Sequence, residues 1–275
     1  MAVPQFILRM LPSEPKDRRR FLAHVVPFVV FMAFVQITLW MTLDNQYAHW
    51  WKRAPEQVMF PLQTLVVGGL LIYFWREYKF TPIRGIGLAL VLGTLGIVCW
   101  LLPEYLYHRL GVADWGPGPR ISIPLVIDTK EDGNWQLLGL AERLEGFDPT
   151  FIREAGHELL YWGAVFFRFL RMVVIVSLVE EIFWRGFLQR FLVNPDKPFH
   201  KTPFGTHTWK AYFLTTIFFT LVHNPVDWFA CLIFGSIVYW ISIRTKSLAA
   251  CVAAHAIANL FLGLYTMYFQ KWGFW

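Results

Sequence analysis

Three stretches of the sequence place ionisable or amide side chains inside segments that are otherwise apolar. In chain order they are Glu180-Glu181 with Arg185, Phe219 with His223, and His255 with Asn259. The spacing of four puts the two residues of the second stretch on one helix face, and likewise those of the third. An ionisable group inside a bilayer is costly and is therefore a candidate for function. The cost falls if the groups meet one another's hydrogen-bonding needs, so we expect the three stretches to converge in one interior pocket.

A carboxylate, two imidazoles and an amide in a protected pocket are the groups that peptide-bond hydrolysis requires. A carboxylate that has lost its hydration can take a proton from a catalytic water molecule, and a neighbouring imidazole can orient that water. A second imidazole and an amide can donate to the oxyanion of the tetrahedral intermediate. No Ser or Cys stands out as the nucleophile, since Ser177 lies one helical turn from Glu180 but has no base near it in the sequence.

Helical spacing predicts different surroundings for the two adjacent glutamates. Glu181 and Arg185 are four residues apart with the acid first, the favoured order for an ion pair within a helix. Glu180 points about 100° away and is left to face something else. It lies about ten residues from both Arg171 and Arg190, or roughly 15 Å along a helix, which places it near the middle of a bilayer. An interpretation in which the cluster only fixes helix packing is less favourable, because one Glu–Arg pair would suffice and the second acid would add cost.

The same residues allow a second interpretation, a zinc site. Glu180, His223 and His255 could hold a catalytic zinc ion, since two His and one Glu form such sites. Against this, the sequence has no His-Glu-x-x-His, and Glu181 would be the only obvious separate base. We therefore expect no metal and no other cofactor, with zinc as the minor alternative.

The composition is that of a polytopic membrane protein. Of 275 residues, 56% are hydrophobic and only 16% are charged, against roughly 25% in soluble domains. The formal net charge of +6 concerns the orientation of the chain in the membrane and does not indicate nucleic-acid binding. Three dispersed cysteines, Cys99, Cys231 and Cys251, make no disulfide framework and no zinc spacing. We expect the lipid bilayer as a partner and no nucleic acid.

Apolar runs predict an all-α bundle of seven to eight transmembrane helices in a single membrane domain, residues 1–275. The runs cover residues 21–43, 58–75, 86–102, 156–193, 211–223, 228–243 and 247–269. The fourth is interrupted by Arg168 and Arg171, and it forms either one long helix or an interfacial helix followed by a spanning one. The polar segment 1–20 is expected at the membrane surface. The connection 108–155 is expected as a long loop with a short amphipathic helix at 135–144.

Basic residues predict how the bundle lies in the membrane. With the N-terminus inside, the inner segments hold fifteen Lys and Arg, and the short outer segments hold three. This bias places the N-terminus and the 194–210 loop in the cytoplasm, and the 108–155 loop and the C-terminus outside. Arg185 and Arg190 then lie on the cytoplasmic side of Glu180. We therefore expect the site to open toward the cytoplasm, in a protein of the plasma (inner) membrane.

The three motifs resemble those of the CPBP family, the CAAX prenyl protease and bacteriocin-processing proteins, also called the Abi family. Glu-Glu-x-x-x-Arg, Phe-x-x-x-His and His-x-x-x-Asn are complete, in order and on successive apolar segments within residues 170–262. The resemblance implies an all-helical intramembrane glutamate endopeptidase with this region as its catalytic core. The long 108–155 connection and the sequence Glu-Ile-Phe-Trp-Arg-Gly-Phe also resemble those of the CAAX protease-related subset found beside exosortase systems.

The resemblance further implies roles for individual residues. Glu180 and His223 would activate the water. His255 and Asn259 would form the oxyanion hole. The partner would be a peptide or protein, with lipid-modified and membrane-anchored chains among the candidates. The residues that would shape the site are Glu181, Arg185 and Phe219.

Two other functions are compatible with the same residues. A non-catalytic immunity or scaffold protein of this fold would tolerate a substitution of Glu180. A proton-coupled transporter would use intramembrane Glu and His as a relay. A transporter is the less favoured of the two, because it would favour repeated halves, whereas every intramembrane ionisable cluster here lies in the C-terminal third of the chain.

Overall fold

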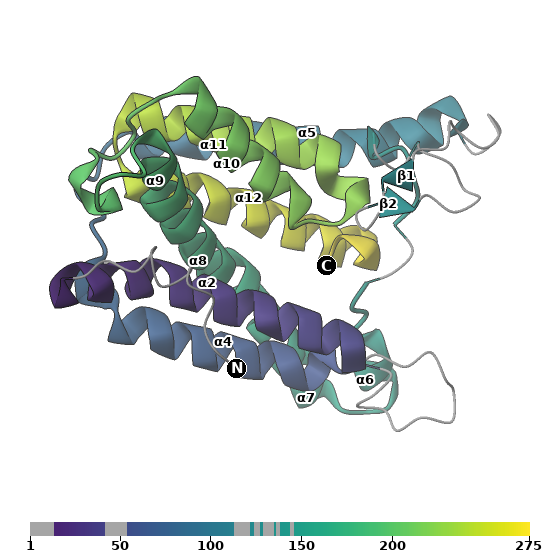
Figure 1. Cartoon of the computed structure of the whole chain (residues 1–275). Coiled ribbons are helices and arrows are strands. Elements are labelled where there is room, and N and C mark those ends of the chain that lie inside the picture. Colours follow the sequence, from purple (N-terminus) through teal and green to yellow (C-terminus); the bar gives the residue numbers. More distant parts are fainter. Residues whose placement is uncertain are drawn as a thin grey trace.

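The structure, a computed structural model, describes residues 14–41, 54–112, 122–123, 127–128, 135, 138–143 and 146–275. Helices make up most of this part of the chain (Figure 1). Within it, the strands are two antiparallel pieces of two residues each, β1 (Ser122–Ile123) and β2 (Ile127–Asp128). The predicted all-α fold class is confirmed.

Six helices in the described residues are long and apolar enough to cross a membrane. They are α2 (Pro15–Met41), α4 (Glu56–Tyr73), α5 (Ile86–Leu110), the helix Glu158–Val193, the helix Pro225–Thr245 that contains α11 (Trp228–Thr245), and α12 (Leu248–Phe269). The chain is therefore an integral membrane protein. The remaining apolar run, 211–223, forms α10 (Trp209–Leu221), which has only 13 residues. At 1.5 Å per residue it reaches about 20 Å, short of the roughly 30 Å hydrocarbon core.

Two predicted boundaries shift. Helix α2 begins at Pro15, so residues 15–20 form its charged first turns. Helix α5 continues past residue 102 to Leu110 and ends at Gly111, whose φ of 63° suits a residue without a side chain. The amphipathic helix expected at 135–144 is absent from the part of this segment that the structure describes, residues 135 and 138–143, which form turns, a bend and irregular chain.

The segment 158–193 is one continuous helix of 36 residues, which answers the question of one helix or two. It consists of α7 (Glu158–Phe169), a π-helical segment Leu170–Val176, α8 (Ser177–Glu181), a second π-helical segment Ile182–Leu188, and α9 (Gln189–Val193). We call this the composite helix. Such wide turns often mark functional positions in a helix, and here they flank both glutamates.

The helices form two layers joined by the composite helix (Figure 1). Helices α2, α4 and α7 lie in one layer, and α5, α10, α11 and α12 in the other; the composite helix packs on α4 through α7, on α12 through α8 and on α10 through α9. Glycines let α5 approach its neighbours. A Cβ at Gly93 would lie 2.3 Å from the carbonyl oxygen of Ala254, and one at Gly96 would lie 2.7 Å from the ring of Phe234.

The bundle has two distinct ends, which Figure 1 shows at left and right. The basic end, at left, is formed by residues 14–20, 75–85, 194–208 and 244–247. The loop end, at right, is formed by α6 (Thr150–Glu154), the β1–β2 pair and residues 108–112, 222–227 and 270–275.

Candidate active site

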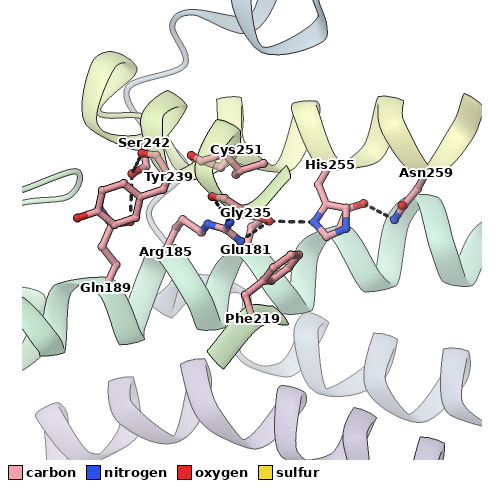
Figure 2. Close-up of polar contacts among 12 residues, drawn as sticks. Glu181, Arg185, Gln189, Phe219, Gly235, Tyr239, Ser242, Cys251, His255 and Asn259 are labelled. Carbon is pink, nitrogen blue, oxygen red and sulfur yellow. Dashed lines mark hydrogen bonds and ion pairs between the residues drawn. The ribbon is translucent and has the colours of Figure 1, made fainter. Parts of the chain in front are cut away.

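A buried polar cluster centres on Glu181. Its Oε1 accepts hydrogen bonds from Arg185 Nη1 at 3.0 Å and from His255 Nδ1 at 2.9 Å (Figure 2). Arg185 Nη2 also donates to the carbonyl of Gly235 at 3.2 Å, and its guanidinium lies over the ring of Phe219 at 5.1 Å. Glu181 and Arg185 are 0% and 1% exposed. The predicted intrahelical ion pair is present, and His255 is an additional partner that joins α12 to the composite helix.

The four residues predicted to carry the chemistry line one cavity of about 310 Å³. They are Glu180 from α8, His223 beside the end of α10, and His255 and Asn259 from α12. Phe219 lines the same cavity. Three segments that are far apart in sequence therefore converge, as expected from the cost of isolated polar groups in a membrane.

Glu180 is the free acid of the site. Its side chain lines the cavity and is 6% exposed, and its Oε2 is buried without a hydrogen-bond partner in the described residues. Glu181 Oε2 is buried without a partner as well, but its Oε1 accepts from two donors, whereas no hydrogen bond reaches Glu180 from the described residues. A buried carboxylate oxygen without a protein donor is available to a water molecule or a substrate.

His223 is held so that one ring nitrogen remains available. Its Nδ1 lies 2.7 Å from the carbonyl oxygen of Phe219, which can only accept, so Nδ1 carries the proton in this contact. In the neutral ring, Nε2 is then an acceptor. The ring packs against Phe219 and Trp100, with centroid distances of 4.7 and 6.1 Å.

Asn259 is fixed against the first π-helical segment. Its Nδ2 donates to the carbonyl of Met172 at 2.6 Å and lies 3.5 Å from Ser177 Oγ, which itself donates to the same carbonyl at 3.4 Å. Both N–H groups of the amide therefore have acceptors within the protein, although the residue still lines the cavity. The other residue of the His255–Asn259 pair is supported by Phe234, whose ring packs on the imidazole of His255 with a centroid distance of 5.3 Å.

The cavity is closed toward the basic end and reaches the loop end. Beyond Glu181 and Arg185 on the basic side, Gln189 and Ser242 are fully buried and hydrogen-bonded to each other at 3.0 Å (Figure 2). On the opposite side, the lining includes residues of the loop end, of which Asn224 is exposed.

The lining of the cavity therefore does not extend to the side of Arg185 and Arg190, where we expected the opening. Both guanidiniums fill that side with bonds inside the protein, because Arg190 donates to the carbonyls of Gly186, Thr202 and His200.

A set of ion pairs joins separate segments where the cavity reaches the loop end. Arg143, whose side chain is 3% exposed, forms ion pairs with Asp227 at 2.9 Å and with Glu104 at 3.4 Å. Lys271 also pairs with Glu104 at 3.4 Å. Since Asp227 lines the cavity, the connection between α5 and α6 contributes to the site through Arg143. No sequence pattern predicts these ion pairs, because the four residues lie on separate segments.

In the described part of the chain, no group of three His, Cys, Asp or Glu side chains is arranged to hold a metal ion. Of the candidate zinc ligands, His255 uses Nδ1 on Glu181, which leaves Nε2 to face the cavity.

Several lining residues were not predicted as part of the site. Trp100 and Phe234 carry no pattern that separates them from other apolar residues. Arg168 and Arg171 also line the cavity. In the sequence they stood out only because they interrupt the apolar run 156–193.

Residues 162–261 match the family model described as Type II CAAX prenyl endopeptidase Rce1-like. No curated protein and no solved structure matches the chain. The matched region contains all three motifs and every residue of the Glu181 cluster.

Proposed function

We propose that this chain, whose residues 162–261 match the Rce1-like family model, is a member of that family and an intramembrane endopeptidase that works by a glutamate mechanism. The observation that carries the proposal is the convergence of Glu180, His223, His255 and Asn259 on one cavity, with an unpaired acid among them.

In the proposed reaction, a water molecule lies between Glu180 and His223. The Glu180 carboxylate takes one proton, and Nε2 of His223 accepts a hydrogen bond that orients the water oxygen toward the scissile carbonyl. The C–O bond forms and the carbonyl electrons move to the oxygen. When the intermediate collapses, the C–N bond breaks and the proton on Glu180 passes to the leaving amine.

The oxyanion is proposed to bind on the α12 side of the cavity. His255 donates Nδ1–H to Glu181, and in its doubly protonated form it can also donate from Nε2. Glu181 stabilises that cation, and Arg185 compensates the charge of Glu181. The amide of Asn259 lies one turn further and supplies a second donor when one of its two N–H groups turns from Met172 or Ser177 to the oxyanion. Fixed donors of this kind act where charge develops in the transition state.

We also propose that water activation needs no metal. Extensive chelation of the purified protein should then leave turnover unchanged, as measured by peptide hydrolysis together with a metal analysis. Loss of activity on chelation with recovery by zinc alone would instead favour a zinc site at Glu180, His223 and His255.

The proposed location is the plasma (inner) membrane, with the basic end in the cytoplasm because Lys and Arg favour that side. In this orientation the cavity opens away from the cytoplasm. The substrate is then a peptide or protein that presents its scissile bond at the outer side of the membrane, and lipid-modified or membrane-anchored chains reach that position.

Comparison of Glu180→Gln with the parent protein tests the function. Membranes from both should be compared for newly formed N- and C-termini of their proteins, and only the parent should generate the specific cleavage products. Glu158→Gln is the matched control, because Glu158 lies on the same helix but is exposed and paired with Arg153. Identical termini in the parent and in Glu180→Gln would refute the endopeptidase and favour a scaffold protein.

A further inference from the structure

Two arginines of the composite helix line the cavity between Glu180 and the loop end. Arg168 and Arg171 are 7% and 9% exposed. The charge of Glu56 acts on Arg168 and that of Glu180 on Arg171, but neither arginine forms an ion pair with a carboxylate among the described residues. Removing a cation from water costs several kcal/mol unless an acid or several acceptors replace the water. Two such cations side by side in a membrane protein call for a partner.

Their hydrogen bonds leave most of the donors unused. Arg171 Nε donates to Oε1 of Gln63, which is itself anchored through Nε2 to the carbonyl of Phe31 at 2.8 Å. Arg168 Nε is buried without a partner, and no other hydrogen bond leaves either guanidinium within the described part of the chain. A guanidinium has five N–H donors. Gln63 thus orients one arginine toward the cavity while most donors of both remain free.

Aromatic rings support the two cations but supply no acceptor for them. Both guanidinium carbons lie over the ring of Phe60, at 4.6 Å for Arg168 and 4.3 Å for Arg171. Trp275 and Phe31 add a second ring to each, at 5.8 and 5.1 Å. Cation–π contacts offset part of the desolvation cost. Two like charges on one ring still repel each other, so an anion between them would relieve both the repulsion and the unpaired donors.

We propose that Arg168 and Arg171 form an anion subsite that binds a carboxylate of the peptide substrate; this rests on the proposed endopeptidase function. Planar guanidiniums bind carboxylates through paired hydrogen bonds, which matches the free donors. The subsite lies on the mouth side of Glu180, so it contacts the substrate segment that extends toward the loop end.

Helix geometry sets the distance from the scissile bond to that carboxylate. Arg171 is nine residues from Glu180, or about 13 Å along the helix, and an extended peptide covers about 3.3 Å per residue. The carboxylate therefore lies roughly four residues from the bond that is cut. Either the C-terminus of the substrate or an Asp or Glu side chain can supply it.

Binding to the full-length Glu180→Gln protein tests the subsite without hydrolysis. The probes are three acetylated hydrophobic octapeptides of one sequence: with a free C-terminal carboxylate, with a C-terminal amide, and with an amide plus Asp at the last position. We expect at least one of the two acids to bind about 10- to 100-fold tighter than the neutral amide, the range for hydrogen bonds to a charged group. The acid that binds tighter identifies the source of the carboxylate.

The arginine variants assign that preference to the subsite. Arg168→Gln and Arg171→Gln should bind acid and amide equally, while Arg168→Lys should keep part of the preference. Arg153→Gln is the matched control, since Arg153 is exposed and paired outside the cavity. If Arg171→Gln fails to fold because Gln63 loses its partner, Arg168→Gln decides alone, because Arg168 has no hydrogen bond to the described residues.

Three outcomes would overturn the subsite. The first is equal binding of all three peptides, or binding of none, by the protein with both arginines present. The second is an acid preference that survives in the folded glutamine variants. The third is stabilisation by phosphatidylglycerol vesicles that depends on the two arginines while the acidic peptides have no effect, which would make the pair a lipid headgroup site. An intact acid preference in a protein whose parent hydrolyses nothing would refute only the endopeptidase function.

Discussion

Adjacent residues Glu180 and Glu181 have opposite surroundings. Glu181 is fully buried and its Oε1 accepts from both Arg185 and His255, so its charge is compensated inside the protein. Glu180 lines the cavity and accepts no hydrogen bond from the described residues. One glutamate is thus held by two side chains, and the other is the acid that the proposed mechanism uses.

Arg185→Ala should strongly destabilise the protein. It would leave Glu181 as a buried acid with one of its two side-chain partners removed, and breaking such a pair typically costs about 3–5 kcal/mol. We expect much lower abundance in membranes and a lower midpoint of thermal unfolding. Arg153→Ala, which removes an exposed ion pair, should cost at most about 1 kcal/mol. Equal abundance and turnover of Arg185→Ala and the parent would contradict the pairing.

Exchanging the two charges, Glu181→Arg with Arg185→Glu, should not restore function. The new cation at position 181 would lie against His255, which now donates to the carboxylate at 2.9 Å. Recovery of stability and turnover in the exchanged protein would show that His255 does not depend on Glu181.

Asn259→Ala should lower turnover less than Glu180→Gln or His223→Ala. Loss of one oxyanion donor costs roughly 100- to 1,000-fold in kcat with little change in KM. The same amide bonds the Met172 carbonyl, so thermal stability should fall as well, with Ser177 keeping one bond to that carbonyl. A loss as complete as that of Glu180→Gln, or an effect on KM alone, would argue against the oxyanion role.

Among the elements, the composite helix decides the geometry of the site. Its π-helical segments flank α8 and set the angle between the glutamates and the residues nearer the loop end. The Met172 carbonyl, in the first of these segments, receives the side chains of Asn259 and Ser177. The helix thereby carries Glu180, holds Asn259 and presents two arginines to one cavity.

Deletion of Val174 tests the importance of the first π-helical segment. Removal of one residue should rotate the preceding part of the helix by about 100° relative to Glu180. Met172 would leave Asn259, and hydrolysis should be lost while membrane insertion, which depends on length and apolarity, persists. Val174→Ala is the control, since this side chain is 42% exposed. Full activity of the deletion variant would show that the wide turn is dispensable.

Over the whole molecule, the two ends of the bundle differ both in charge and in their distance from the cavity. The basic residues gather at one end of the bundle, and the cavity reaches the other. The residues between the cavity and the basic end are buried and hydrogen-bonded, so we expect water and substrate to reach Glu180 from the loop end.

Single cysteines at exposed positions of the two ends test this orientation. In a variant without the partly buried Cys99, a membrane-impermeant maleimide should label Asn224→Cys in intact cells, but Lys201→Cys only after lysis. The native Cys231 and Cys251 are buried and should stay unlabelled. The reverse labelling pattern would place the cavity mouth in the cytoplasm.

The membrane class, the helical architecture and the residues that gather in the interior were all predictable from the amino-acid sequence. The physical reason is free energy. An apolar run of spanning length is most stable in the bilayer, and polar side chains within it are stable only where they can hydrogen-bond to one another. The pair Glu181–Arg185 was predictable because four residues make one helical turn.

The partners that these residues have across helices depend instead on how the helices pack. His255 on Glu181, Asn259 on Met172 and Arg143 on Asp227 each join segments that lie far apart in sequence. The π-helical turns and the direction of the cavity also depend on packing, because no local pattern specifies which side of a buried acid is filled by neighbouring helices and which side stays open.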